Sequence, residues 1–141
     1  MAETIRTVDY YYVKSPDKPG EGGKLLSVFR DAGVNLLAVH AFPERRHVQV
    51  DLVPEDAAPF LKAARKAKLK ISRKKKAFLV TGDDRIGVLA GILEKLGKAN
   101  INVTAVTALC AGSGRFGAIF WIHWAKATDL RRAAKALGLT K

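Results

Sequence analysis

The chain has 141 residues, 48% of them hydrophobic, so it can form one ordinary domain or two small ones and is too apolar for a disordered chain. No apolar run approaches the roughly 18 residues of a membrane-spanning helix, and the single cysteine excludes an internal disulfide. We therefore expect a soluble, cytoplasmic protein with no membrane partner. The net charge of +12 is uneven, because residues 60–141 hold 18 Lys/Arg against 4 Asp/Glu.

The first half of the chain predicts strands and helices by its periodicity. Thr7–Val13 is rich in β-branched and aromatic residues, which favours a strand. Apolar residues at helical spacing follow, and Gly33 ends that helix. The remaining expected elements are strands at residues 34–42 and 48–52, a helix from residue 54 to about 67, and a short strand at residues 69–71.

The second half predicts the same order of elements without the last strand. The expected elements are strands at residues 77–81, 101–109 and 118–124, and helices at residues 87–99 and 128–137. The glycine-rich run 112–117 has the spacing of a dinucleotide fingerprint, but a strand follows it rather than a helix, so we expect a hairpin. Residues 138–141 are too short for a fourth strand, which leaves one sheet edge uncovered unless another segment pairs with it.

An internal repeat organises the chain, because a shift of 67 residues lays its second half over its first. Acid, base, glycine, apolar spacing and asparagine recur in order without a gap. The matched segments are Asp17-Lys18-Pro19-Gly20 with Asp84-Arg85-Ile86-Gly87, and Asn35-Leu36 with Asn102-Val103. The sequence therefore predicts an α+β protein of two ferredoxin-like βαββαβ modules in tandem, residues 1–73 and 74–141, the second lacking a full last strand.

The repeated pattern resembles that of the ACT domain family. An acid-base-x-Gly loop precedes an amphipathic helix, and a small residue, an apolar residue and asparagine begin the next strand, as in Gly33-Val34-Asn35-Leu36 and Asn100-Ile101-Asn102-Val103. The resemblance covers nearly the whole chain. The stretch of residues 35–42 is also similar to that of stand-alone proteins made of tandem ACT domains. It implies a regulatory module that binds an amino acid where two such domains meet.

The resemblance also implies which residues form the ligand site. They are the loop and strand-start residues of both copies: Asp17, Lys18, Gly20, Asn35, Leu36, Asp84, Arg85, Gly87, Asn102 and Val103. In the first copy Gly22 and Gly23 replace an expected leucine position, and Ile86 stands where the first copy has Pro19.

The chemistry of these residue types suits an amino acid. A glycine before a helix lets backbone approach a ligand, and the unpaired N–H groups of the helix start attract a carboxylate. An aspartate can receive the ammonium group, and an asparagine offers both donor and acceptor. Two other interpretations stay open: Asp17 and Asp84 can cap their helices, and Asn35 and Asn102 can serve only the turn into a strand.

We expect no catalysis, no cofactor and no metal. The sequence lacks a nucleophile–base constellation, and His40 and His47 have no third ligand at a suitable spacing. The alternative function is nucleic-acid binding by the basic stretch of residues 62–76, which holds nine Lys/Arg and no acid.

A homodimer is expected, with an amino acid at a domain or subunit interface. The strand 118–124 is apolar on both faces, which predicts that Ile119 and Trp121 form an exposed patch on the face away from the helices. A second interpretation stays open: the two sheets of one chain can cover each other, which would bury this patch without a second subunit. The missing last strand predicts an open edge nearby.

Overall fold

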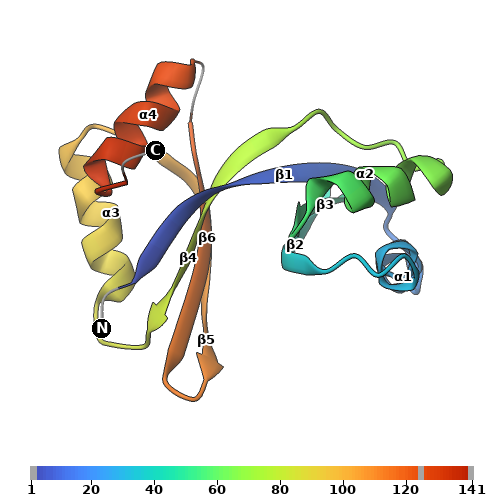
Figure 1. Ribbon diagram of the computed structural model, residues 1–141, viewed down its shortest axis with the longest axis horizontal. Helices are drawn as coiled ribbons and strands as arrows, with labels where there is room; N and C mark the ends of the chain where they lie inside the picture. The colour runs from blue at the N-terminus through green and yellow to red at the C-terminus, as the bar shows by residue number, and fades with distance from the viewer. Residues whose placement is uncertain (1–2, 124–125, 140–141) are drawn as a thin grey trace. The chain divides into compact units, whose positions relative to one another are not determined.

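The computed structural model describes residues 3–123 and 126–139, and within these ranges the fold is α+β, with six strands and four helices (Figure 1). The elements in chain order are β1 (Thr4–Pro16), α1 (Glu21–Asp31), β2 (Leu36–Glu44), β3 (His47–Pro54), α2 (Ala57–Lys66), β4 (Lys75–Asp83), α3 (Val88–Lys98), β5 (Val103–Gly112), β6 (Arg115–Ile122) and α4 (Ala127–Ala136). Two compact units contain them, residues 9–75 and residues 1–8 with 76–141. The predicted boundary between residues 73 and 74, which separates the two repeats of the sequence, stays a prediction.

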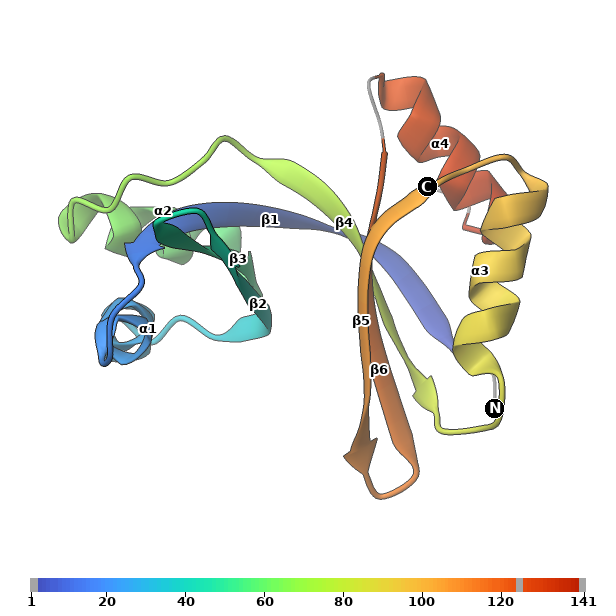
Figure 2. The same cartoon turned by 180° about the vertical axis from the view of Figure 1, so that it is seen from behind.

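The unit of residues 9–75 packs α1 and α2 on one face of a sheet in the order β2-β3-β1 (Figure 2). Antiparallel pairing sets Val13 opposite Val50 and Tyr11 opposite Leu52, so all four side chains face the helices. Phe29 of α1 stacks on Phe60 of α2 with ring centroids 4.6 Å apart, and both rings are fully buried.

The other unit repeats this architecture with β4, α3, β5, β6 and α4. Its sheet runs β1-β4-β6-β5, and the apolar stripes of α3 and α4 cover one face. Phe78 and Phe120 face each other across β4 and β6 with centroids 5.1 Å apart. Ile92 and Leu96 of α3 close this core.

The described residues after α4 form no strand, and the sheet edge beside β4 that was expected to be open is occupied by the N-terminal part of β1. β1 is the hydrogen-bonded neighbour of β4. Gly82 of β4 lies so close to Glu3 that a Cβ added to Gly82 would stand 2.8 Å from the Cα of Glu3. Within the described residues, the strand beside β4 on this side therefore comes from residues that precede the unit of residues 9–75 in the chain.

The prediction of a short strand at residues 69–71 is wrong: residues 69–74 have no regular secondary structure. The segment still lies beside β1: the N–H of Ser72 donates to the Tyr12 carbonyl at 3.0 Å, and the Tyr12 N–H donates to Ser72 Oγ at 2.9 Å. A side-chain oxygen thus replaces one carbonyl of the expected ladder. The other expected elements are present, with ends shifted by a few residues; residue 124, the last of the expected strand 118–124, lies outside the described residues.

The exposed patch expected on β6 is absent. Ile119 and Trp121 are each only 7% exposed, although neither belongs to the helix-facing cores. The two-sided apolar strand thus reflects burial on both faces.

None of the described helices is long and apolar enough to cross a bilayer.

Candidate functional site

The loops before α1 and α3 have the same backbone conformation. Gly20 and Gly87 are the N-cap residues and hold φ angles of 86° and 79°. The space beside each is open, yet any residue with a Cβ would be strained at these angles. Neither helix start has a side-chain cap, so the interpretation of Asp17 and Asp84 as helix caps is wrong.

Both helices begin with N–H groups that have no partner inside the helix. The first hydrogen bonds of the two helices run from the Lys24 N–H to the Gly20 carbonyl and from the Gly91 N–H to the Gly87 carbonyl, each at 3.0 Å. The first of the preceding N–H groups donates to a loop carbonyl, from Glu21 to Lys18 at 3.3 Å and from Val88 to Arg85 at 3.4 Å. The N–H groups between this one and the first intrahelical bond carry the positive end of the helix dipole and suit an anionic ligand group. In α1 the exposed Gly22 and Gly23 leave this start bare.

Asn35 and Asn102 are held by their backbones and present their side chains to solvent. The Asn35 carbonyl accepts from Glu55 N at 2.9 Å, and the Asn102 carbonyl accepts from His123 N at 3.1 Å. Within the described part of the chain neither amide side chain makes a hydrogen bond. The left-handed residues of these turns are Gly33 and Asn100, so the turn does not require an asparagine at position 35 or 102.

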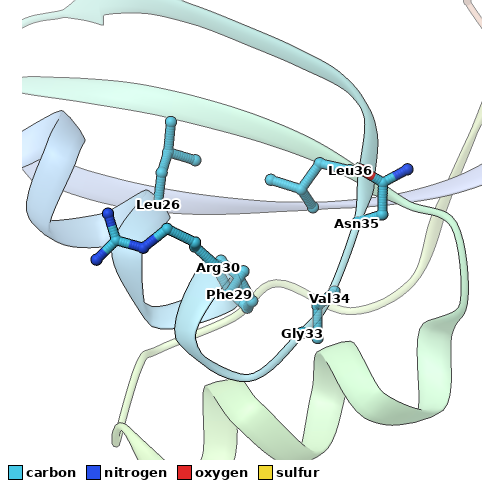
Figure 3. A pocket seen from close by; sticks show the side chains of 7 residues that line it. All are labelled: Leu26, Phe29, Arg30, Gly33, Val34, Asn35 and Leu36. Atoms are coloured by element: carbon cyan, nitrogen blue, oxygen red, sulfur yellow. The ribbon is translucent and has the colours of Figure 1, made fainter.

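In the first copy, the strand-start residues line an open hollow of about 450 Å³ beside α1 (Figure 3). Figure 3 shows Leu36 directed toward α1 and the Asn35 amide directed away from it. Arg30 is the cationic group of the lining, and its Nε donates to Asp31 at 2.9 Å. The predicted loop residues Asp17, Lys18 and Gly20 are not among the residues that line this hollow.

In the second copy, the loop residues line a hollow and the strand-start residues do not. Asp84, Arg85 and Gly87 border a cavity of about 250 Å³, whose other walls are the beginning of α3, Phe116 and the end of β5. Asn102 and Val103 lie outside the lining.

The length of the first helix explains why each hollow contains only half of the predicted site. α1 and α3 have 11 residues each, which at 1.5 Å per residue separates the loop from the strand start by about 16 Å. An amino acid is too short to touch both ends of one helix. Within one module the structure therefore brings together either the loop residues or the strand-start residues, never both.

The second loop already contains charged partners. Arg85 donates to Glu3 at 2.6 Å, and the Glu3 backbone together with this guanidinium lowers the pKa of the Glu3 carboxyl. A hydrogen bond with Asp84 raises the pKa of the exposed Cys110 thiol, which lies in the lining of the same cavity. Lys18, the counterpart of Arg85, makes no ion pair among the described residues.

Sequence reasoning did not identify Cys110, Phe116 or Arg30 as lining residues. Cys110 and Phe116 reach the loop because they form a cross-strand pair at the end of the β5–β6 hairpin. The two-residue periodicity of β5 and β6 indicates which side chains share a face of the hairpin. It does not indicate that the turn end of this hairpin lies beside the loop before α3. Among the described residues no three His, Cys, Asp or Glu side chains gather as metal ligands would.

No model of a known protein family matches the chain, and no curated protein matches it in sequence. Solved structures do match its fold. A protein of Bacteroides thetaiotaomicron has a TM-score of 0.72 at 12% identity, covering 94% of this chain and 88% of that one. The regulatory subunit of aspartate kinase from Thermus flavus has a TM-score of 0.63 at 15% identity, covering 98% and 95%.

The ligand-free regulatory subunit of aspartate kinase from Thermus thermophilus gives a TM-score of 0.60 at 16% identity, covering 96% of this chain and 97% of that one. At such identities these likenesses establish the fold alone. The fold is thus that of aspartate kinase regulatory subunits, in agreement with the ACT-like fold that the sequence resemblance implies.

Proposed function

We propose that this protein is a regulatory module that binds a free amino acid between two copies of the chain. The observation that carries the proposal is the division of the site: the loop residues and the asparagine lie at opposite ends of one 11-residue helix. A single ligand meets both only if the loop of one copy adjoins the strand start of another.

The chemistry of the proposed site follows from its two halves. The N–H groups at the start of α3, with Arg85 beside them, attract the ligand carboxylate. Asp84 receives the ammonium group beside the Cys110 thiol, which lines the same cavity. Asn102 of the partner copy orients the ligand through an amide that is exposed and makes no other hydrogen bond among the described residues.

The edge strand β5 supports a dimer in which these halves meet. All of its residues after Val103 are exposed, and none is charged. Among the described residues the exposed large hydrophobic side chains are Val39, Ile86, Val106 and Leu109. Three of these four lie on β5 or in the loop before α3, and a long apolar edge without charges favours pairing with another strand.

The geometry of such a pairing brings the right groups together. Two β5 strands related by a twofold axis run antiparallel, so the beginning of one strand lies beside the end of the other. The beginning of β5 follows Asn102, and its end lies beside the Asp84–Gly87 loop. Each twofold pair would thus contain two identical sites.

We assign the working site to the second copy, because the equivalent edge in the first copy is less suited to pairing. β2 carries Pro43 and ends at Glu44, and proline and charge both protect an edge strand. Asp17, Lys18, Gly20, Asn35 and Leu36 then form the corresponding half-sites of the first copy. The shared fold with the aspartate kinase regulatory subunits supports a regulatory role for the chain.

A screen of the twenty free amino acids by thermal unfolding tests this function. We expect one or a few of them, and not their D-enantiomers, to raise the melting temperature. A ligand at 100 times its dissociation constant adds about 2.7 kcal/mol to the free energy of unfolding. Absence of any shift at millimolar concentration would contradict the proposal, and an equal shift with nucleotides or sugars would redirect it to another ligand class.

The dimer gives a second prediction, measured by sedimentation equilibrium at micromolar concentration. The wild type should be a dimer, and Val106→Lys should weaken association at least tenfold, because burying an unpaired ammonium group is costly. Val39→Lys is the matched control, since Val39 occupies the equivalent position on β2 and is similarly exposed. A monomeric wild type, or equal loss in both variants, would remove β5 as the contact.

A further inference from the structure

A stripe of basic side chains follows α2 and the segment that joins it to β4. It holds eight Lys/Arg between residues 62 and 75, and all eight acids of residues 9–75 precede this stripe. Seven of the eight side chains are exposed, and the eighth, Lys75, is half-buried. Within the described ranges none of the eight forms an ion pair. We name it the basic stripe; its members are Lys62, Arg65, Lys66, Lys68, Lys70, Arg73, Lys74 and Lys75.

Local structure accounts for only part of this charge. Arg65 and Lys66 occupy the last turn of α2, where cations interact favourably with the helix dipole. Lys70, Arg73 and Lys74 belong to no helix. The helix dipole therefore does not account for these three cations.

The stripe passes over a hollow with an aromatic wall. Tyr12, Lys14, Lys70, Ile71 and Ser72 line a cavity of about 290 Å³. Lys75 Nζ lies 5.8 Å from the centroid of the half-buried Tyr12 ring. Asp51, which pairs with Tyr12 in register, is only 5% exposed and does not line the cavity. The hollow thus combines an aromatic ring with ammonium groups and has no carboxylate in its lining.

The length of the stripe selects a polymeric anion over a small one. The part from Lys68 to Lys75 alone extends for up to about 25 Å, whereas one phosphate group contacts only a few ångströms of surface. A chain of phosphates matches a row of cations of this length, and each contact releases a counterion.

The distribution of apolar residues selects a nucleic acid over a membrane. Proteins that bind anionic bilayers add apolar side chains that insert beside the cations. In this unit the exposed large hydrophobic residue is Val39, on β2, at the opposite edge of the sheet order β2-β3-β1. The segment that joins α2 to β4 lies beside β1 (Figure 1). The basic stripe contains no exposed large hydrophobic residue.

We propose that the basic stripe and the Tyr12 hollow form a binding surface for single-stranded nucleic acid. The cations follow the phosphate backbone, and the Tyr12 ring stacks a base that enters the hollow, with Lys14 and Lys75 beside it. A single strand fits better than a duplex, because only an unpaired base can turn into a hollow between side chains. None of its residues belongs to the proposed amino-acid site.

Fluorescence anisotropy with a labelled 20-nucleotide single-stranded RNA tests the surface. We expect the full chain to bind with a dissociation constant of about 10 µM or lower at 50 mM salt. The triple variant Lys70→Gln/Arg73→Gln/Lys74→Gln should reduce the slope of log affinity against log salt by about 2, since each lost contact accounts for about 0.7. Tyr12→Leu should weaken binding about tenfold by loss of stacking.

The matched control is Lys98→Gln/Arg131→Gln/Lys135→Gln, which removes the same charge from exposed positions on α3 and α4. It should change the affinity less than twofold, and circular dichroism should show that all variants are folded. The proposal is overturned if the wild type does not bind RNA at 50 mM salt or if both triple variants lose affinity equally. Preference for a duplex or for phosphatidylserine vesicles would also overturn it.

Discussion

The Gly82→Ala variant should lose about 3 kcal/mol of unfolding free energy, because its new methyl group has no room. The Cβ would stand 2.8 Å from the Cα and 2.9 Å from the Cβ of Glu3, and the Glu3 Cα belongs to backbone that cannot rotate away. Relief requires the Glu3 backbone to move from β4, which disturbs the start of β1 at Thr4 and the pairing of β1 with β4.

Gly117→Ala is the control for the Gly82 variant. Gly117 lies on β6 opposite Thr81, which is the neighbour of Gly82 along β4. The atom nearest to a Cβ added to Gly117 is the Val80 carbonyl oxygen, at 3.9 Å. Alanine in a strand interior is about 0.5–1 kcal/mol more favourable than glycine, so this variant should be neutral or slightly stabilised. Urea unfolding followed by circular dichroism measures both. Equal effects would show that β1 is not held against Gly82.

Replacing Gly87 by valine should weaken amino-acid binding at least a hundredfold. At a φ of 79° a β-branched residue is strained, and its side chain would fill the space where a ligand reaches the start of α3. A hundredfold loss corresponds to about 2.7 kcal/mol of binding free energy. Calorimetric titration with an amino acid found by the thermal screen measures it.

Gly20→Val introduces the same strain at the N-cap of α1, where φ is 86°. Because we assign the working site to the second copy, this variant should bind with an affinity within about twofold of the wild type. Loss of binding in Gly20→Val with retention in Gly87→Val would place the site in the first copy. Unchanged affinity in both folded variants would remove the loops from the site.

The sequence predicted the order of elements well, because local periodicity determines it. The alternation in β3 correctly identifies a strand whose Val50 and Leu52 face the helix-side core, although Asp51 and Val53 on its other face are buried as well. Gly33 lies in the turn after α1 with a φ of 72°, which is the reason that a glycine marks the end of this helix.

The sequence did not predict which segment covers β4. Residues 4–8 and β4 are about 75 positions apart, and β pairing between distant segments leaves no local pattern. The apolar run around Trp121 indicated only that both faces avoid water; whether they do so by folding or by dimerisation depends on tertiary structure. In the structure the side chains of Ile119 and Trp121 on this face are each only 7% exposed.

For the candidate site, the repeat identified chemically suitable residues but not their distances. Asp84 and Asn102 are 18 positions apart in sequence, and the intervening α3 holds them at opposite ends. Cys110 enters the lining only through hairpin pairing with Phe116. Such placements depend on strand register and helix length, which single-residue patterns do not encode.

Subunit complementation tests the central claim most directly, because the proposed site takes its loop from one copy and its asparagine from the other. Gly87→Val and Asn102→Ala should each abolish amino-acid binding as separate dimers. After subunit exchange, an equimolar mixture should regain about one quarter of the wild-type sites with wild-type affinity in calorimetric titration, since half of the dimers then contain one intact site. A mixture that binds no amino acid, although the wild type binds it and exchange is complete, would contradict a site shared between two copies.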